Sequence, residues 1–192
     1  MINKNTRSYF HKLSELLLSV KVTNRNGAAI SLDKGTHKAV EMLLSVKSTF
    51  KKAMLIGNGG SAAIASHIQN DFCKVVGVRA IVFNDIPLLT ALSNDYGYDC
   101  VFERLIELWA DTNDLLFAIS SSGRSENILR AVSIASVRKC QIITLSGFNA
   151  KNPLRCRGEL NFYVPSQAYG HVELVHYALL HFLTDYAESK LR

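Results

Sequence analysis

The feature that most constrains the fold of this chain is a regular alternation of short apolar segments with longer stretches of helical periodicity. The apolar segments are predicted strands near residues 53–57, 79–83, 114–119, 141–145 and 160–164. The stretches between and after them are predicted helices near residues 61–73, 98–110, 125–138 and 171–190. Strands and helices that alternate in this way imply right-handed crossovers and a parallel sheet with helices on both faces. The sequence therefore predicts a three-layer α/β fold.

The first fifty residues have a different pattern, which predicts two helices. Apolar residues recur at helical spacing from Thr6 to Val22, and a break at 24–28 contains Asn and Gly. A second helix is predicted to begin near Ser31 and to run to about Phe50. No linker or internal repeat divides the 192 residues, a length that suits one domain with a sizeable core. We therefore predict one domain over residues 1–192, with an N-terminal helical pair.

Composition and charge favour a cytoplasmic protein and argue against a membrane or nucleic-acid function. No apolar run approaches the roughly 20 residues that span a bilayer, and no secretory signal is recognised at the N-terminus. The cysteines lack Cys-x-x-Cys spacing, so we expect free thiols in a reducing cytosol. The formal net charge of +6 is dispersed, and no run of five basic residues occurs. We expect a basic surface that attracts anionic metabolites.

Two turns rich in glycine and serine lie where predicted strands end and helices begin. They are Gly57–Ser61 and Ser120–Ser125. At such a junction, free backbone N–H groups and the positive end of the helix dipole favour an anion. An open parallel sheet binds its ligand beyond the carboxyl ends of its strands, where both turns and residues 144–148 are expected to lie. Because neither turn fits a dinucleotide or ATP pattern, we predict a site for a small phosphorylated metabolite.

Four motifs in this order carry a resemblance to a known family. They are Gly57-Asn-Gly-Gly-Ser-Ala-Ala63, Asn94-Asp-Tyr-Gly97, Ser120-Ser-Ser-Gly-Arg-Ser-Glu-Asn127 and Glu173-Leu-Val-His176. Together they resemble the SIS (sugar isomerase) domain, and specifically the phosphoheptose isomerases. The resemblance implies a doubly wound sheet of five parallel strands and a homotetramer. In such a tetramer, residues 1–50 pack on the domain and at subunit interfaces, and the active sites lie at subunit boundaries. It also implies conversion of sedoheptulose 7-phosphate to D-glycero-D-manno-heptose 7-phosphate for lipopolysaccharide or capsule heptose.

The same resemblance implies a set of site residues. The residues expected to bind the sugar phosphate are Asn58, Gly59, Gly60, Ser61, Asp71, Asn94, Asp95, Ser120, Ser121, Ser122, Ser125 and Glu173. The family binds one zinc ion through a His-x-x-x-Glu pair and a Gln-x₇-His pair, and the corresponding residues here are His67, Asp71, Glu173 and His181. Asp71 stands where the family has Glu, and Glu173 stands where it has Gln.

Helix geometry bears on this predicted zinc site. His67 and Asp71 are four residues apart, so they share a helix face and can converge on one ion or on a substrate. The alternative is an ordinary surface pair. Glu173 and His181 are eight residues apart, a rise of about 12 Å, so in one chain they would strain to reach the same ion. Ligands from two subunits would remove this difficulty. His181 has a second interpretation as a core histidine bound to backbone, and we interpret His171 and His176 as structural.

The leading functional interpretation is an isomerase that moves a proton between neighbouring carbons through an enediol. We assign Asp71 as the base and His181 as the group that delivers or orients protons, with zinc as a Lewis acid. The alternative is a non-catalytic tetramer that binds a partner protein, similar to the factor that associates with the replication initiator in enteric bacteria. A phosphosugar-sensing regulatory domain ranks last, since no DNA-reading segment accompanies it. The residues His67, Asp71 and His181 favour the enzyme, because an adaptor has no need of metal-type ligands.

Overall fold

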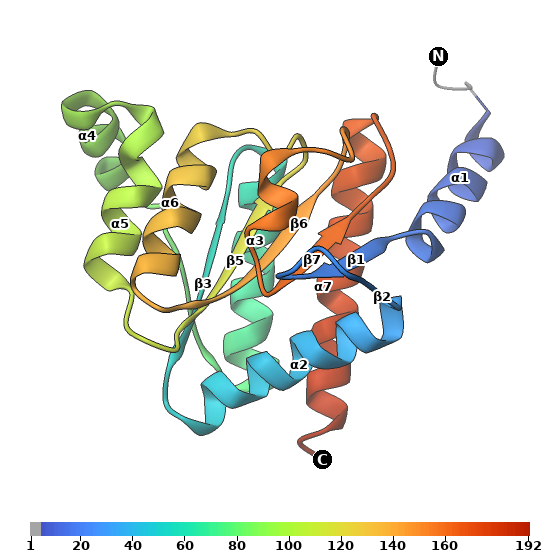
Figure 1. The fold of residues 1–192 in the computed structure, drawn as a ribbon, viewed down its shortest axis with the longest axis horizontal. Helices are drawn as coiled ribbons and strands as arrows, with labels where there is room; N and C mark the ends of the chain where they lie inside the picture. The colour runs from blue at the N-terminus through green and yellow to red at the C-terminus, as the bar shows by residue number, and fades with distance from the viewer. Residues whose placement is uncertain (1–4) are drawn as a thin grey trace.

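The computed structural model describes residues 5–192, and its central element is a mixed sheet of seven strands with helices on both faces (Figure 1). The strand order is β2-β1-β7-β6-β5-β3-β4. Strands β3 to β7 are parallel, whereas β1 pairs antiparallel with both β2 and β7. The strands are β1 (Lys21–Asn24), β2 (Ala29–Ile30), β3 (Lys52–Gly57), β4 (Arg79–Val82), β5 (Leu115–Ser120), β6 (Gln141–Ser146) and β7 (Leu160–Tyr163). The predicted α/β fold is confirmed, with two more strands than expected.

The helices divide between the two faces of the sheet. They are α1 (Thr6–Leu18), α2 (Leu32–Ser48), α3 (Gly60–Asp71), η1 (Phe72–Val76), α4 (Ile86–Tyr96), η2 (Tyr98–Cys100), α5 (Val101–Trp109), α6 (Glu126–Val137), η3 (Pro153–Cys156) and α7 (Tyr169–Ser189). Helices α1, α2, α3 and α7 bury one core with Leu115 and Phe117, and α5 and α6 bury the other with Leu116 and Ala118. Alternate residues of β5 thus enter opposite cores, which explains its uninterrupted apolar sequence.

The predicted helix from Thr6 to Val22 is wrong at its C-terminal end. Helix α1 ends at Leu18, and Lys21–Asn24 instead forms β1 at the side of β7. The break at 24–28 is a hairpin turn, in which the Asn24 side chain accepts hydrogen bonds from two backbone N–H groups that follow it. Asx turns of this kind reverse the chain locally. The second helix begins after Ser31, whose hydroxyl caps it, and ends at Ser48.

A second difference from the predicted elements is the helix α4. Asp85 caps it through the Leu88 N–H, and a proline occupies its first turn. None of its residues is buried. The helix predicted over 98–110 is therefore preceded by another helix, and it begins only at Val101. No helix in the described range, 5–192, is long and apolar enough to cross a membrane.

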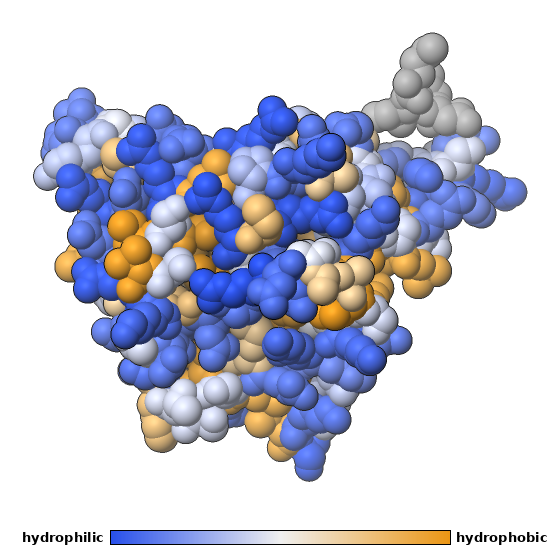
Figure 2. Space-filling model, viewed as in Figure 1, coloured by the Kyte–Doolittle hydropathy of each residue, from blue (hydrophilic) through white to orange (hydrophobic). Residues whose placement is uncertain are grey.

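Strand register brings the two glycine- and serine-rich turns together. Gly57 at the end of β3 pairs with Ile119, and Ser120 at the end of β5 pairs with Ser146 at the end of β6. All three following loops therefore leave the same edge of the sheet. Figure 2 shows a mostly hydrophilic face with separate apolar groups in the same view as Figure 1.

Candidate functional site

The two turns line one small cavity. It has a volume of about 130 Å³ and is lined by Asn58, Ser61, Ile119, Ser120, Ser121, Ser122, Ser125, Tyr169 and Glu173. We call it the cradle. The hydroxyl oxygens of Ser120 and Ser125 lie 3.2 Å apart. The buried hydroxyl of Ser121 has no hydrogen-bond partner among residues 5–192. A buried hydroxyl without a partner is costly, and an anion in the cradle would accept its hydrogen bond.

Helix N-termini add to the anion-binding character of the cradle. Gly60 begins α3 immediately after the diglycine turn, and Ser125 is the N-cap residue of α6, to which it gives no side-chain cap. The first N–H groups of α6 are therefore open to a ligand, whereas at the start of α3 the Ser61 N–H donates to the Asn58 carbonyl at 3.0 Å and only the Gly60 N–H has no partner among the described residues. Convergence of two helix N-termini and several serine hydroxyls is the arrangement that suits a phosphate group.

Asn58 is held in place by two residues to which the sequence analysis gave no role. Its side-chain amide exchanges two hydrogen bonds with Asn127 at 2.9 and 3.0 Å, and the Tyr98 hydroxyl donates to its Oδ1 at 2.7 Å. Asn127 is buried on α6. These bonds tie the diglycine turn to α6 and to η2, and they leave one N–H of the Asn58 amide for a ligand. The pairing could not be found from sequence because the three residues are far apart in the chain.

A cluster of three possible metal ligands lies where α3 packs against α7. The Asp71 Oδ2 atom lies 3.3 Å from His67 Nε2 and 3.6 Å from His181 Nδ1. One ligand atom from each residue falls within 4.8 Å of the other two. Tyr177 contacts both imidazole rings edge-on, with ring centroids 5.1 and 4.5 Å away. Two imidazoles and one carboxylate form a donor set that zinc accepts.

Glu173 lies apart from this cluster. It lines the cradle and also a second cavity of about 350 Å³ between α3 and α7, which reaches His67 and Tyr177. Its carboxylate lies over the start of α3, where a side chain at Gly60 would meet Glu173 Oε1 at 2.6 Å. The structure of the single chain therefore brings together three of the four expected metal ligands and places the fourth between the cluster and the cradle.

The two histidines interpreted as structural are buried. His176 Nε2 lies 3.2 Å from the Ser146 carbonyl oxygen, and complete burial lowers the pKa of His176 to about 4. His171 stacks on Tyr9 with ring centroids 4.3 Å apart. A neutral His176 bonded to the last residue of β6 fixes α7 against the sheet edge that carries the cradle.

Comparisons with known proteins bear on the family of this chain. A family model described as the SIS domain matches residues 8–147. The phosphoheptose isomerase of Helicobacter hepaticus is 35% identical over 145 residues, which is 72% of this chain and 74% of that protein. The chain belongs to the SIS-domain phosphoheptose isomerase family. The solved structures of phosphoheptose isomerases from Francisella tularensis and Neisseria gonorrhoeae have TM-scores of 0.81 and 0.79 at 26% and 27% identity. Each comparison covers 95% of this chain and 96% of the other.

Membership of the phosphoheptose isomerase family confirms the resemblance seen in the motifs and makes the chain an isomerase by class. Two residues that the resemblance implies in substrate binding lie elsewhere in this single chain. Asn94 and Asp95 are exposed near the end of α4, where the Asn94 amide donates to the Asp95 carboxylate at 3.0 Å. They line neither of the two cavities described above.

The cradle leads to a prediction about phosphate binding. Replacing Ser120 and Ser125 together by Ala is expected to weaken sugar-phosphate affinity at least about tenfold, since hydrogen bonds to a charged group contribute about 1.5–3 kcal/mol each. Isothermal titration calorimetry would measure the affinity. Ser136→Ala, at an exposed position of α6, is the matched control. An unchanged affinity in the double variant would place the phosphate outside the cradle.

Proposed function

We propose that this chain interconverts sedoheptulose 7-phosphate and D-glycero-D-manno-heptose 7-phosphate, in the supply of heptose for lipopolysaccharide or capsule. The observation that carries the proposal is one continuous arrangement along α3 and α7. The cradle lies at the N-terminal ends of these helices, and the cavity lined by Glu173 and His67 extends from it towards the metal-type cluster. Relatives named phosphoheptose isomerase support the substrate class.

We propose zinc as the metal, held by His67, Asp71 and His181. The chemistry of the donor set supports this, because each side chain offers a ligand atom that zinc accepts and none of the three is fully buried. When bound, zinc would act as a Lewis acid that polarises the sugar carbonyl. Glu173 is the expected fourth ligand, and its distance along α7 favours a contribution across a subunit boundary.

The proton transfer follows from the positions of two side chains. Asp71 is the proposed base, which removes the proton from the carbon next to the carbonyl and returns it to the neighbouring carbon of the enediol. Its carboxylate is only 16% exposed, so water competes little for it. His181 lies within reach of the same carboxylate, and it would exchange protons with the sugar oxygens. The serines of the cradle would fix the far end of the sugar during both steps.

We also propose a homotetramer with active sites at subunit boundaries. Helix α1 has a single buried residue, Leu16, and projects from one side of the chain (Figure 1), with Phe10 and Leu18 exposed on it. Helix α4, which carries Asn94 and Asp95, has no buried residue. Packing against neighbouring copies would bury such faces and would bring α4 to another subunit's cavity.

A coupled assay on sugars of different length tests this function. We expect the highest kcat/KM for sedoheptulose 7-phosphate, lower values for six- and five-carbon ketose phosphates, and loss of activity in chelator that added zinc restores. Similar rates on the shorter sugars would overturn the seven-carbon assignment. Phosphate binding without turnover on any of these sugars would favour the interaction platform for a partner protein instead.

A further inference from the structure

A large groove lies at the opposite end of the sheet from the cradle. Its volume is about 880 Å³, and the second half of α2, the turn into β3, the start of β4 and the C-terminal end of α7 form its walls. In Figure 1 these elements meet at the lower part of the molecule, near the C-terminus. Because Arg79 begins β4 at the amino ends of the parallel strands, the groove is separated from the cradle by the length of the sheet.

Three cations and one carboxylate line this groove. The cations are Lys47, Lys51 and Arg79, and the carboxylate is Glu41. Lys51 and Arg79 form no ion pair within the described residues 5–192, and Lys47 uses one of its three N–H groups on the Val76 carbonyl at 2.7 Å. The groove is therefore positively charged and retains unused donors, which favours an anionic ligand.

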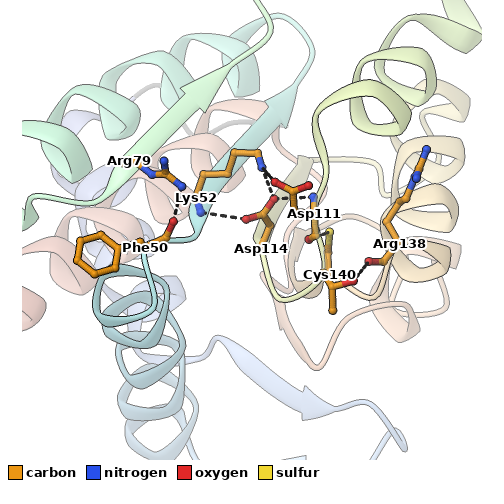
Figure 3. Close-up of polar contacts among 8 residues, drawn as sticks. Phe50, Lys52, Arg79, Asp111, Asp114, Arg138 and Cys140 are labelled. Carbon is orange, nitrogen blue, oxygen red and sulfur yellow. Dashed lines mark hydrogen bonds and ion pairs between the residues drawn. The ribbon is translucent and has the colours of Figure 1, made fainter.

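A carboxylate outside the groove, that of Asp111, is already paired with Lys52. Lys51 and Arg79 both contribute to lowering the pKa of Asp111, but the largest cause is the hydrogen bond from Lys52. That bond joins Lys52 Nζ to Asp111 Oδ2 at 2.8 Å (Figure 3). Asp111 is thus directed to Lys52, and it forms no ion pair with Lys51 or Arg79.

Phe50 presents an aromatic ring at the edge of the groove. It has a positive φ of 55°, a region that bulky side chains rarely adopt, and the residue is 81% exposed. The turn is nevertheless fixed by two hydrogen bonds. The Phe50 carbonyl accepts one from the Arg79 side chain, and the Phe50 N–H donates to the backbone carbonyl of Lys47 at 3.2 Å. Figure 3 shows the ring directed away from the Lys52 cluster. The positive φ belongs to the Schellman motif that ends α2, in which the Lys51 N–H donates to the Val46 carbonyl at 2.9 Å, and this motif leaves the ring exposed at the groove.

Gly77 leaves room for the Lys47 side chain, which donates to the Val76 carbonyl. A side chain at Gly77 would lie 3.3 Å from the Lys47 ammonium nitrogen, and the positive φ of 73° at this position also favours glycine. The ammonium group therefore stays in the groove, near the turn that carries Phe50 and Lys51. The groove thus offers cations that can bind an anion and an exposed ring that can pack against a planar group.

We propose that this groove binds a small phosphorylated molecule with an aromatic ring, such as a nucleoside phosphate. Lys51, Arg79 and Lys47 bind the phosphate groups, and the planar ring stacks on Phe50. The groove volume of about 880 Å³ lies within the range of small-molecule sites. The proposal is independent of the isomerase activity, because no residue of the groove lines the cradle or the metal-type cluster.

Calorimetric titration of the full chain with ADP tests the proposal. Adenosine and pyrophosphate serve as half-ligands, and we expect ADP to bind at least about tenfold more tightly than either, because a stacked base contributes about 1–3 kcal/mol. Pyrophosphate binding as tight as that of ADP would overturn the proposal. So would the absence of ADP binding up to millimolar concentration.

Two variants assign the binding to the groove. Phe50→Gly removes the ring and suits the positive φ, so the fold is retained, and Lys51→Gln removes one charge. Each is expected to weaken ADP binding about tenfold, while Lys38→Gln on the same α2 helix leaves it unchanged. The Ser120→Ala, Ser125→Ala double variant should bind ADP as the native chain does. Affinity that falls only in the cradle variant would show that ADP occupies the active site and would overturn the proposal.

Discussion

Replacing Asp71 by Asn is expected to lower kcat for isomerisation by about 10²–10⁴-fold, the contribution typical of a general base. The amide has nearly the same shape as the carboxylate but cannot accept a proton from carbon, and it is a weaker metal ligand. Asp71 also lies between His67 and His181, so its charge organises both imidazoles. The cradle is formed by other residues, and sugar-phosphate affinity should therefore change little. Steady-state kinetics and calorimetry on the same preparation would separate the two effects.

Two further variants test whether the loss of turnover is due to the carboxylate of Asp71. Asp71→Glu restores the carboxylate of the family pattern with one more methylene, and it is expected to lose less turnover than Asp71→Asn, because a group that accepts the proton remains and a displacement of about 1 Å can cost on the order of 100-fold. Asp185→Asn removes an exposed carboxylate from α7 outside the cluster and should have no effect. Unaltered turnover in Asp71→Asn would remove the assignment of the base.

The strands of the parallel sheet could be predicted closely from the sequence. Strand β5, for example, has residues buried on both faces, so its sequence is an uninterrupted apolar run bounded by polar residues. The cradle was predictable for a related reason. Each of its turns directly follows such a strand, and the parallel arrangement then brings the turns to one edge.

The elements missing from the predicted set bury few residues, although residues typical of a hairpin turn and of a helix start do mark them: Asn26-Gly27 before β2, and Asp85 with Pro87 at α4. Strand β1 has only one buried residue, Val22, and its pairing partner β7 lies well over a hundred residues away in the chain. Helix α4 has no buried residue, and only Leu89 and Leu92 of its side chains are partly buried against the core. Asn127 and Tyr98 hold Asn58 through contacts that depend on the folded chain. Helix geometry did anticipate the separation of Glu173 from His181, because rise per residue is a local property.

Replacing Asp114 by Ala is expected to lower the free energy of unfolding by about 3–5 kcal/mol, the cost typical of breaking a buried ion pair. Asp114 is fully buried, and its carboxylate accepts hydrogen bonds from the backbone N–H groups of Lys52 at 3.0 Å and of Asp111 at 2.7 Å (Figure 3). The Lys52 ammonium lies 2.5 Å from Asp114 Oδ2. Burial acts to lower the pKa of Lys52, but the hydrogen bonds that its ammonium group donates to both aspartates outweigh it and raise the pKa.

The Asp114 variant thus leaves a largely buried cation and two N–H groups without partners at the amino ends of β3 and β5, where both cores begin. Asp111→Ala is the matched control, because it removes the other carboxylate on Lys52, which is 71% exposed, and should cost much less. Urea unfolding followed by circular dichroism would measure both variants. Equal losses of unfolding free energy in the two variants would contradict the prediction. They would mean that Lys52 is stabilised mainly by Asp111 and that the ion pair with Asp114 contributes little. A large loss of unfolding free energy for Asp114→Ala alone would confirm the prediction. It would show that a buried carboxylate at the amino ends of the strands stabilises the sheet whose carboxyl ends carry the cradle.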